Sequence, residues 1–152
     1  MDSLLNHSLL HLLHRASQVA DDIFAGHPEL NGLTSRQFIV LAAISAREGA
    51  SQTDITEVTG VDRSTLTDLI GRLQSRGLVA RNRSQHDARS YEVRLTPEGR
   101  KLLVAAVPIA RGVDERLLSS LPAKARKEFV EHLHGMVAAT DGPVPGAKSM
   151  AT

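Results

Sequence analysis

The stretch QTDITEVTGVDRSTLTDLIGRL, residues 52–73, decides how this chain folds. Its first part has the pattern of a short amphipathic helix that Ser51 caps and that ends at Gly60, and Asp62 is the expected cap of the helix that follows. A second helix begins at Asp62, and its apolar residues share one face: Leu66, Leu69, Ile70 and Leu73. Two strand patterns, LVARNR (78–83) and SYEVRL (90–95), follow and are joined by a polar tip. A short helix, a turn, a helix and a hairpin predict a winged helix-turn-helix.

The charge of the chain is unevenly distributed, although its net value is only +1. Residues 1–61 hold 3 basic and 7 acidic side chains, which gives −4. Residues 62–101 hold 9 basic and 5 acidic side chains, which gives +4. The positive charge therefore falls on the second helix and the hairpin, where a phosphate backbone would require it.

The composition excludes several classes of function. The chain has 152 residues, 41% of them hydrophobic, and no cysteine, which rules out disulfides and thiolate metal sites. No apolar run approaches the about 20 residues of a membrane span, and no signal peptide is recognisable, so we expect a cytoplasmic protein. Glycine-rich phosphate loops and hydrolase motifs are also missing, so we expect neither an enzyme nor a cofactor.

Helical patterns flank the central stretch on both sides. An amphipathic pattern predicts one long helix over residues 3–25, and Thr34 with Gln37 forms a capping box for the next helix. After the hairpin, Thr96 and Pro97 begin a helix to about residue 119, which contains Pro108. A last helix begins near residue 122. The fold class is therefore mostly α with a small β-hairpin.

The outer helices predict a division of labour along the chain. Residues 31–96 are assigned to the winged helix-turn-helix domain that binds DNA. Residues 1–30 and 97–141 carry apolar stripes that would pair with a second copy, and they form a predicted helical dimerisation region. Residues 142–152, rich in proline and glycine, are predicted to be a flexible tail. The helix that begins at Asp62 is the predicted recognition helix. A dimer would present two copies of it, about 34 Å apart, to a pseudo-palindromic site.

The chain resembles the MarR family of bacterial transcriptional regulators over about residues 4–140. The resemblance is carried by four segments: LTSRQF (33–38), DRSTLT (62–67), RLQSRGLV (72–79), and DAR (87–89) followed by RLTPEG (94–99). It implies a homodimer that binds double-stranded operator DNA, usually as a repressor, and is released by a small phenolic or other aromatic effector. Asp68 departs from the family, which often has a basic residue at this place.

Ten residues of the recognition helix and the hairpin are candidates for DNA contact. Short hydroxyls can approach base edges and guanidinium groups can bind phosphates, although the same positions also suit exposed caps and ion pairs. Asp68 would accept a hydrogen bond from cytosine or turn back on Arg72, and Arg89 would enter the minor groove. The set is Arg63, Ser64, Thr65, Thr67, Asp68, Arg72, Arg83, His86, Asp87 and Arg89.

The effector site is predicted around the first helix. Arg15 corresponds to the position where family members that sense aromatic acids grip a carboxylate, and His11 and His14 would assist it. The alternative is a surface ion pair between Arg15 and Asp22 or Glu29. His7, His11 and His14 also lie one helical turn apart, which leaves a metal-responsive regulator as a second possibility. A DNA-binding module without any effector is a third.

Overall fold

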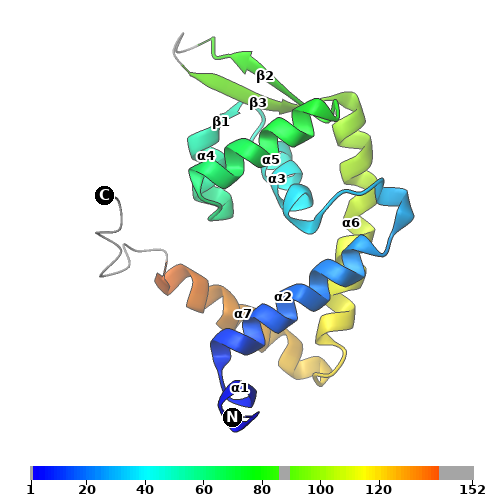
Figure 1. The fold of residues 1–152 in the computed structure, drawn as a ribbon, viewed down its shortest axis with the longest axis vertical. Helices are drawn as coiled ribbons and strands as arrows, with labels where there is room; N and C mark the ends of the chain where they lie inside the picture. Colours follow the sequence, from blue (N-terminus) through cyan, green and yellow to red (C-terminus); the bar gives the residue numbers. More distant parts are fainter. Residues whose placement is uncertain (1, 86–89, 141–152) are drawn as a thin grey trace. The chain divides into compact units, whose positions relative to one another are not determined.

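A computed structural model describes residues 2–85 and 90–140 (Figure 1). The elements, in chain order, are α1 (Asp2–Asn6), α2 (Leu9–Ala25), the 3-10 helix η1 (Pro28–Leu30), α3 (Ser35–Ala46), β1 (Ala50–Ser51), α4 (Gln52–Thr59), α5 (Arg63–Ser75), β2 (Val79–Arg83), β3 (Tyr91–Leu95), α6 (Pro97–Leu118) and α7 (Ala123–Thr140). The chain forms two compact units, residues 1–117 and 118–152, and α7 lies in the second. The fold is mostly helical with a small sheet, as predicted.

The predicted helix caps are present. The hydroxyl of Thr34 accepts the Gln37 N–H at 3.2 Å, and the side chain of Gln37 accepts the Thr34 N–H at 3.1 Å. Ser51 and Asp54 form the same reciprocal pair at the start of α4, and Gly60 ends that helix in the left-handed conformation. Each cap satisfies N–H groups that have no partner inside the helix, so these local signals fix where the helices begin.

The first helical region differs from the single helix predicted over residues 3–25. It is broken after α1, and Ser8 becomes the N-cap of α2 by accepting the His11 N–H at 3.3 Å. Serine competes with the helix because its hydroxyl bonds nearby backbone groups, and the continuous leucine pattern concealed that signal. The prediction of one uninterrupted helix was therefore wrong.

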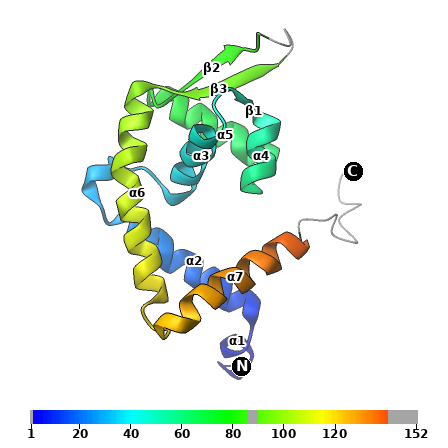
Figure 2. The same ribbon diagram turned by 180° about the vertical axis from the view of Figure 1, so that it is seen from behind.

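The sheet has three strands rather than the two that were predicted. Its order is β1-β3-β2, with all pairs antiparallel, and Ala50 of β1 pairs with Val93 of β3. In the hairpin, Arg81 pairs with Val93 and Arg83 with Tyr91. Figures 1 and 2 show α3, α4 and α5 gathered on one face of the sheet. The two-residue β1 was missed because it exists only through its pairing with β3.

The core of the first unit lies between the sheet and the helices α3 to α5. The four predicted apolar residues of α5 are all buried, with exposed fractions of 9% or less. Gly99 in α6 packs so closely on Leu78, the residue before β2, that an added Cβ would lie 1.9 Å from the Leu78 carbonyl oxygen. The start of α6 is thereby held against the backbone at Leu78.

The longest helix, α6, continues through Pro108 as far as Leu118. Proline costs one backbone hydrogen bond there, which a helix of 22 residues tolerates without ending. Within residues 2–85 and 90–140, no helix is both long and apolar enough to span a membrane.

Candidate nucleic-acid interface

Helix α5 separates its residues into a buried and an exposed side. Its apolar residues face the core, whereas Arg63, Ser64, Thr67 and Asp68 are exposed. Asp62 begins the helix by accepting the Thr65 N–H at 2.9 Å. Hydrogen bonds from the side chain of Thr65 and then from its backbone lower the pKa of the Asp62 carboxyl group. Helix α5 therefore begins with a negatively charged cap.

Three arginines at this surface have no acidic partner among residues 2–85 and 90–140. Among the described residues, no carboxylate lies within ion-pair distance of Arg63 on α5 or of Arg81 and Arg83 on β2. All three are exposed. The described part of the chain does not neutralise their charges, so they supply the positive potential that a phosphate backbone needs.

Two of the predicted contact residues are engaged within the protein. The Thr65 N–H donates to the Asp62 cap at 2.9 Å. The Thr67 hydroxyl donates to the carbonyl of Arg63 at 2.8 Å and accepts from the Gln52 side chain at 3.2 Å. This second bond joins α5 to the first residue of α4 and fixes the geometry of the helix-turn-helix. Contact of either threonine with DNA stays a prediction.

Asp68 and Arg72 form an ion pair along the exposed side of α5. The Arg72 Nε lies 2.9 Å from the Asp68 carboxylate, and both side chains are more than half exposed. This is the alternative that the four-residue spacing allowed. An exposed pair of this kind contributes little stability, about 0.3–0.5 kcal/mol, but it neutralises one positive charge of the recognition helix.

Sequence reasoning missed the role of Arg76, the last residue associated with α5. Its guanidinium donates to the carbonyl of Asn31 at 2.7 Å and to the Gln37 side chain at 3.2 Å. Gln37 is the buried residue of the α3 capping box, and Asn31 has a left-handed backbone with φ of 49°. Arg76 thus ties the recognition helix to the start of α3. No local pattern signals a contact over 39 residues of sequence.

The remaining wing candidates, His86, Asp87 and Arg89, lie outside the described residues. Their assignment rests on the sequence and stays a prediction. The described part of the hairpin carries Arg83 toward this tip, two residues beyond Arg81 on the same strand.

The predicted effector residues on α2 lie on an exposed to half-exposed part of that helix. Arg15 is exposed and donates to Gln18 at 3.1 Å, while Glu29 is paired with His27 at 3.3 Å. His14 is exposed as well. Among the described residues, no three histidine, aspartate or glutamate side chains come together as metal ligands. Nothing in that region therefore favours the metal-responsive alternative, and the role of Arg15, His11 and His14 stays a prediction.

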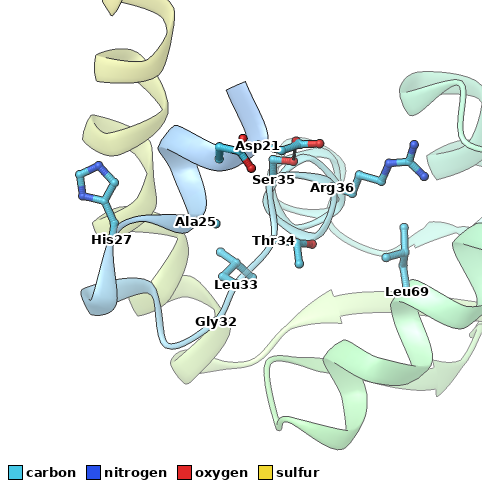
Figure 3. Close-up of a pocket in the computed structure, with 10 residues that line it drawn as sticks. Asp21, Ala25, His27, Gly32, Leu33, Thr34, Ser35, Arg36 and Leu69 are labelled. Carbon is cyan, nitrogen blue, oxygen red and sulfur yellow. Dashed lines mark hydrogen bonds between the residues drawn. The ribbon is translucent and has the colours of Figure 1, made fainter. Parts of the chain in front are cut away.

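A pocket of about 350 Å³ lies between the end of α2, the loop 31–34 and the start of α3 (Figure 3). Asp21, Ala25 and His27 line one side, and Leu69 of α5 reaches it from the other. The Ser35 hydroxyl donates to Asp21 at its edge. Arg15, His11 and His14 are not part of this lining. The pocket is large enough for a small molecule, and Leu69 links it to the buried side of α5.

Comparison with known proteins identifies the class. The model of the MarR family matches residues 31–90, which include α3, α4, α5 and β2 and end just before β3. The transcriptional regulator HosA of Escherichia coli O157:H7 is 38% identical over 109 residues, covering 72% of this chain and 81% of HosA. This chain belongs to the MarR family, whose matched relatives are transcriptional regulators and not enzymes.

Two solved structures share both the fold and the sequence pattern. The Bordetella bronchiseptica protein BpsR, described with regulation of its DNA binding by 6-hydroxynicotinic acid, has a TM-score of 0.79 and 33% identity, covering 86% of this chain and 94% of BpsR. The transcriptional repressor CouR, bound to a 23-mer DNA duplex, has a TM-score of 0.77 and 30% identity, covering 88% and 94%. The chain is thus a winged-helix transcription regulator.

Proposed function

We propose that this chain is a homodimeric repressor that binds a pseudo-palindromic operator and is released by a small aromatic effector. The main supporting observation is the exposed side of α5, where the side chains of Arg63 and Ser64 have no hydrogen-bonding or ionic partner among the described residues. The buried side of the same helix is fully packed, so the exposed side is held rigidly for contact. The likeness to CouR, solved on a DNA duplex, supports the same reading.

Exposed apolar residues support the dimer. On α1 and α2, six leucines have exposed fractions between 41% and 73%: Leu4, Leu5, Leu9, Leu10, Leu12 and Leu13. In the second unit, α7 has no buried residue, and Phe129, Val130, Met136 and Val137 are exposed. Apolar surface of this extent is unfavourable in water, and a second copy of the chain would cover it. Residues 1–30 and 97–141 are the proposed dimerisation region.

Selection from random DNA duplexes tests operator binding without knowledge of the target. A symmetric dimer should enrich a pseudo-palindrome whose half-sites lie one helical turn apart. The Arg63→Ala variant should fail to enrich it, because the exposed cation of α5 is lost. Enrichment of a single half-site, or of no sequence at all, would contradict the proposal. In vitro transcription from a promoter carrying the selected site then distinguishes a repressor from an activator.

The effector proposal has two candidate sites on this chain. The sequence favours Arg15, whose guanidinium suits a carboxylate. The geometry favours the pocket beside Leu33 and Leu69, which is lined mainly by apolar surface and touches α5 directly. The regulation of BpsR by 6-hydroxynicotinic acid makes that heteroaromatic acid the first molecule to test.

A thermal-shift titration with 6-hydroxynicotinic acid and related aromatic acids tests ligand binding. A ligand that binds the folded state raises the melting temperature in a saturable way, and it should also release the selected duplex. Arg15→Ala removes the guanidinium, whereas Ala25→Leu narrows the pocket without altering a core residue. Whichever variant abolishes the shift identifies the site. A chain that responds to none of the acids is a DNA-binding module without an aromatic effector.

A further inference from the structure

The hairpin carries an arginine stacked on an aromatic ring. Arg81 of β2 and Tyr91 of β3 are diagonal neighbours across the two strands, because Arg81 pairs with Val93 and Tyr91 with Arg83. The guanidinium carbon of Arg81 lies 4.9 Å from the centre of the Tyr91 ring. This distance is within the range of a cation–π interaction. Tyr91 nevertheless remains 43% exposed, although it sits on a strand whose neighbour Val93 is fully buried.

Arg81 differs from the arginines that are held by a carboxylate. Arg72, Arg94 and Arg100 are each paired with a carboxylate: Asp68, Glu92 and Glu48. Among the described residues, Arg81 has no carboxylate within ion-pair distance. A ring face restrains a guanidinium without accepting its N–H groups as hydrogen bonds, so those donors stay available. The ring therefore restrains Arg81, while no hydrogen bond from its guanidinium to the described residues occupies its donors.

The position of this pair on the sheet is also informative. Residues that pair directly across strands project from the same face, so Arg81 shares a face with the buried Val93. Helix α5 packs against β2. Arg81 therefore projects on the helix side of the hairpin, between the packed end of the sheet and the tip. A duplex that contacts both α5 and the wing would bring a phosphate to this place.

We propose that Tyr91 is a positioning residue, which holds Arg81 so that its guanidinium binds a phosphate of the DNA backbone. The proposal rests on the DNA-binding function proposed above and adds a contact at the base of the wing. Because a phosphate contact is independent of sequence, a random-sequence duplex of about 40 base pairs is a sufficient probe.

Fluorescence anisotropy of the full chain over a salt series gives both affinity and salt dependence. Arg81→Ala should weaken binding about eightfold near 0.1 M salt and lower the salt slope by about 0.9, the value of one phosphate contact. Tyr91→Leu removes the ring but keeps the arginine, and it should weaken binding about two- to fivefold. Tyr91→Phe keeps the ring and should bind nearly as well as the unchanged chain.

The double variant separates positioning from direct contact. If Tyr91 acts through Arg81, adding Tyr91→Leu to Arg81→Ala should cause no further loss. An additional loss in that background, or a Tyr91→Phe variant as weak as Tyr91→Leu, would show that Tyr91 itself contacts DNA and would overturn the proposal. Arg47→Ala, at the exposed C-cap of α3, is matched in net charge to Arg81→Ala and should leave the salt slope unchanged. Equal melting temperatures show that a loss of binding is not a loss of folding.

The Arg63→Ala variant distinguishes this inference from the function on which it rests. If Arg63→Ala weakens binding while Tyr91→Leu and Arg81→Ala do not, the chain binds DNA and only the role of the stacked pair is overturned. If the unchanged chain does not bind the duplex even at low salt, both the proposed function and this inference fall.

Discussion

Large apolar side chains are mostly buried in the winged region, residues 31–96, but mostly exposed in the first two helices, residues 2–25. In the winged region the large aliphatic residues form most of the buried core, including Leu41, Ile55 and Leu66, which are 0% exposed. In α2 the only buried residue is Phe24, at the end next to that core. The winged region therefore completes its own core, whereas α1 and α2 present apolar surface that the described part of the chain leaves open.

The difference shows which part of the molecule the chain alone can stabilise. Burial of an apolar side chain contributes about 1.5–3 kcal/mol, so the winged region gains its stability within one chain. Leucines that stay half exposed contribute little until another surface covers them. The stability of α1 and α2 should therefore depend on protein concentration, which is a property that can be measured separately for each region.

The largest expected effect is in the core of the winged region. Leu66→Ala should lower the free energy of unfolding by about 2–5 kcal/mol, because it leaves a cavity where the side chain is fully buried. Leu10→Ala, at a leucine that is 70% exposed, is the matched change in α2. Urea denaturation at several protein concentrations measures the free energy of unfolding. Leu66→Ala should lower it by the same amount at every concentration, whereas the effect of Leu10→Ala should depend on concentration. Similar behaviour of the two variants would remove the distinction between the regions.

The joint between the winged region and α6 gives the next effect. Gly99→Ala should destabilise the chain by about 1–3 kcal/mol, since the new methyl group would overlap the Leu78 carbonyl. Gly112→Ala on the same helix meets no atom within 4 Å and should stabilise it by about 0.5–1 kcal/mol. Thermal unfolding of the pair measures both. A Gly99→Ala variant as stable as the original would show that α6 is free to move away from β2.

The exposed leucines of α2 allow the proposed self-association to be tested directly. Leu9→Glu combined with Leu12→Glu should weaken self-association about ten- to hundredfold, because charges would enter the surface that a second copy covers. Ile39→Glu introduces the same charge at an exposed apolar residue of the winged region and should leave the association unchanged. Sedimentation equilibrium reports the dissociation constants. Dissociation by Ile39→Glu instead would move the interface to α3.

The smallest expected effect concerns the α4 cap. Hydrogen bonds from the side chain and then the backbone of Ser51 lower the pKa of Asp54 below its ordinary value of 3.8. A lowered carboxyl pKa stabilises the folded state above the ordinary value, and this contribution is lost as the pH falls through the lowered one. Asp54→Asn should therefore flatten the fall in melting temperature below about pH 4. An unchanged acid profile would mean that the cap does not contribute to acid stability.

The sequence predicted what depends on neighbours close in the chain. Thr34, Ser51 and Asp62 were identified as caps because the hydroxyl or carboxylate and the N–H it accepts are only three residues apart. The buried side of α5 followed from helical periodicity, and the Asp68–Arg72 pair was foreseen as one of two possibilities. The MarR family was recognised from motifs spread over most of the chain, and the comparisons confirm it.

Features that need the tertiary structure could not be predicted. Strand β1 has two residues and no pattern of its own, and its identity comes from β3. The Arg76 bridge to Asn31 and the stacking of Arg81 on Tyr91 join residues that only the fold brings together. The break before α2 left a visible signal in Ser8, but the leucines on both sides masked it. Periodicity could also not show that those leucines would remain exposed.

Leu69 belongs both to the buried side of α5 and to the lining of the pocket beside loop 31–34. Arg76 bonds that loop at Asn31, so the pocket wall and the recognition helix are connected at two points. Binding at two coupled sites is reciprocal: a molecule in the pocket that weakens DNA binding tenfold is itself bound tenfold more weakly by the DNA-bound chain. The concentration at which such a molecule acts is then set by how much DNA the regulator has already bound, and not by the pocket alone.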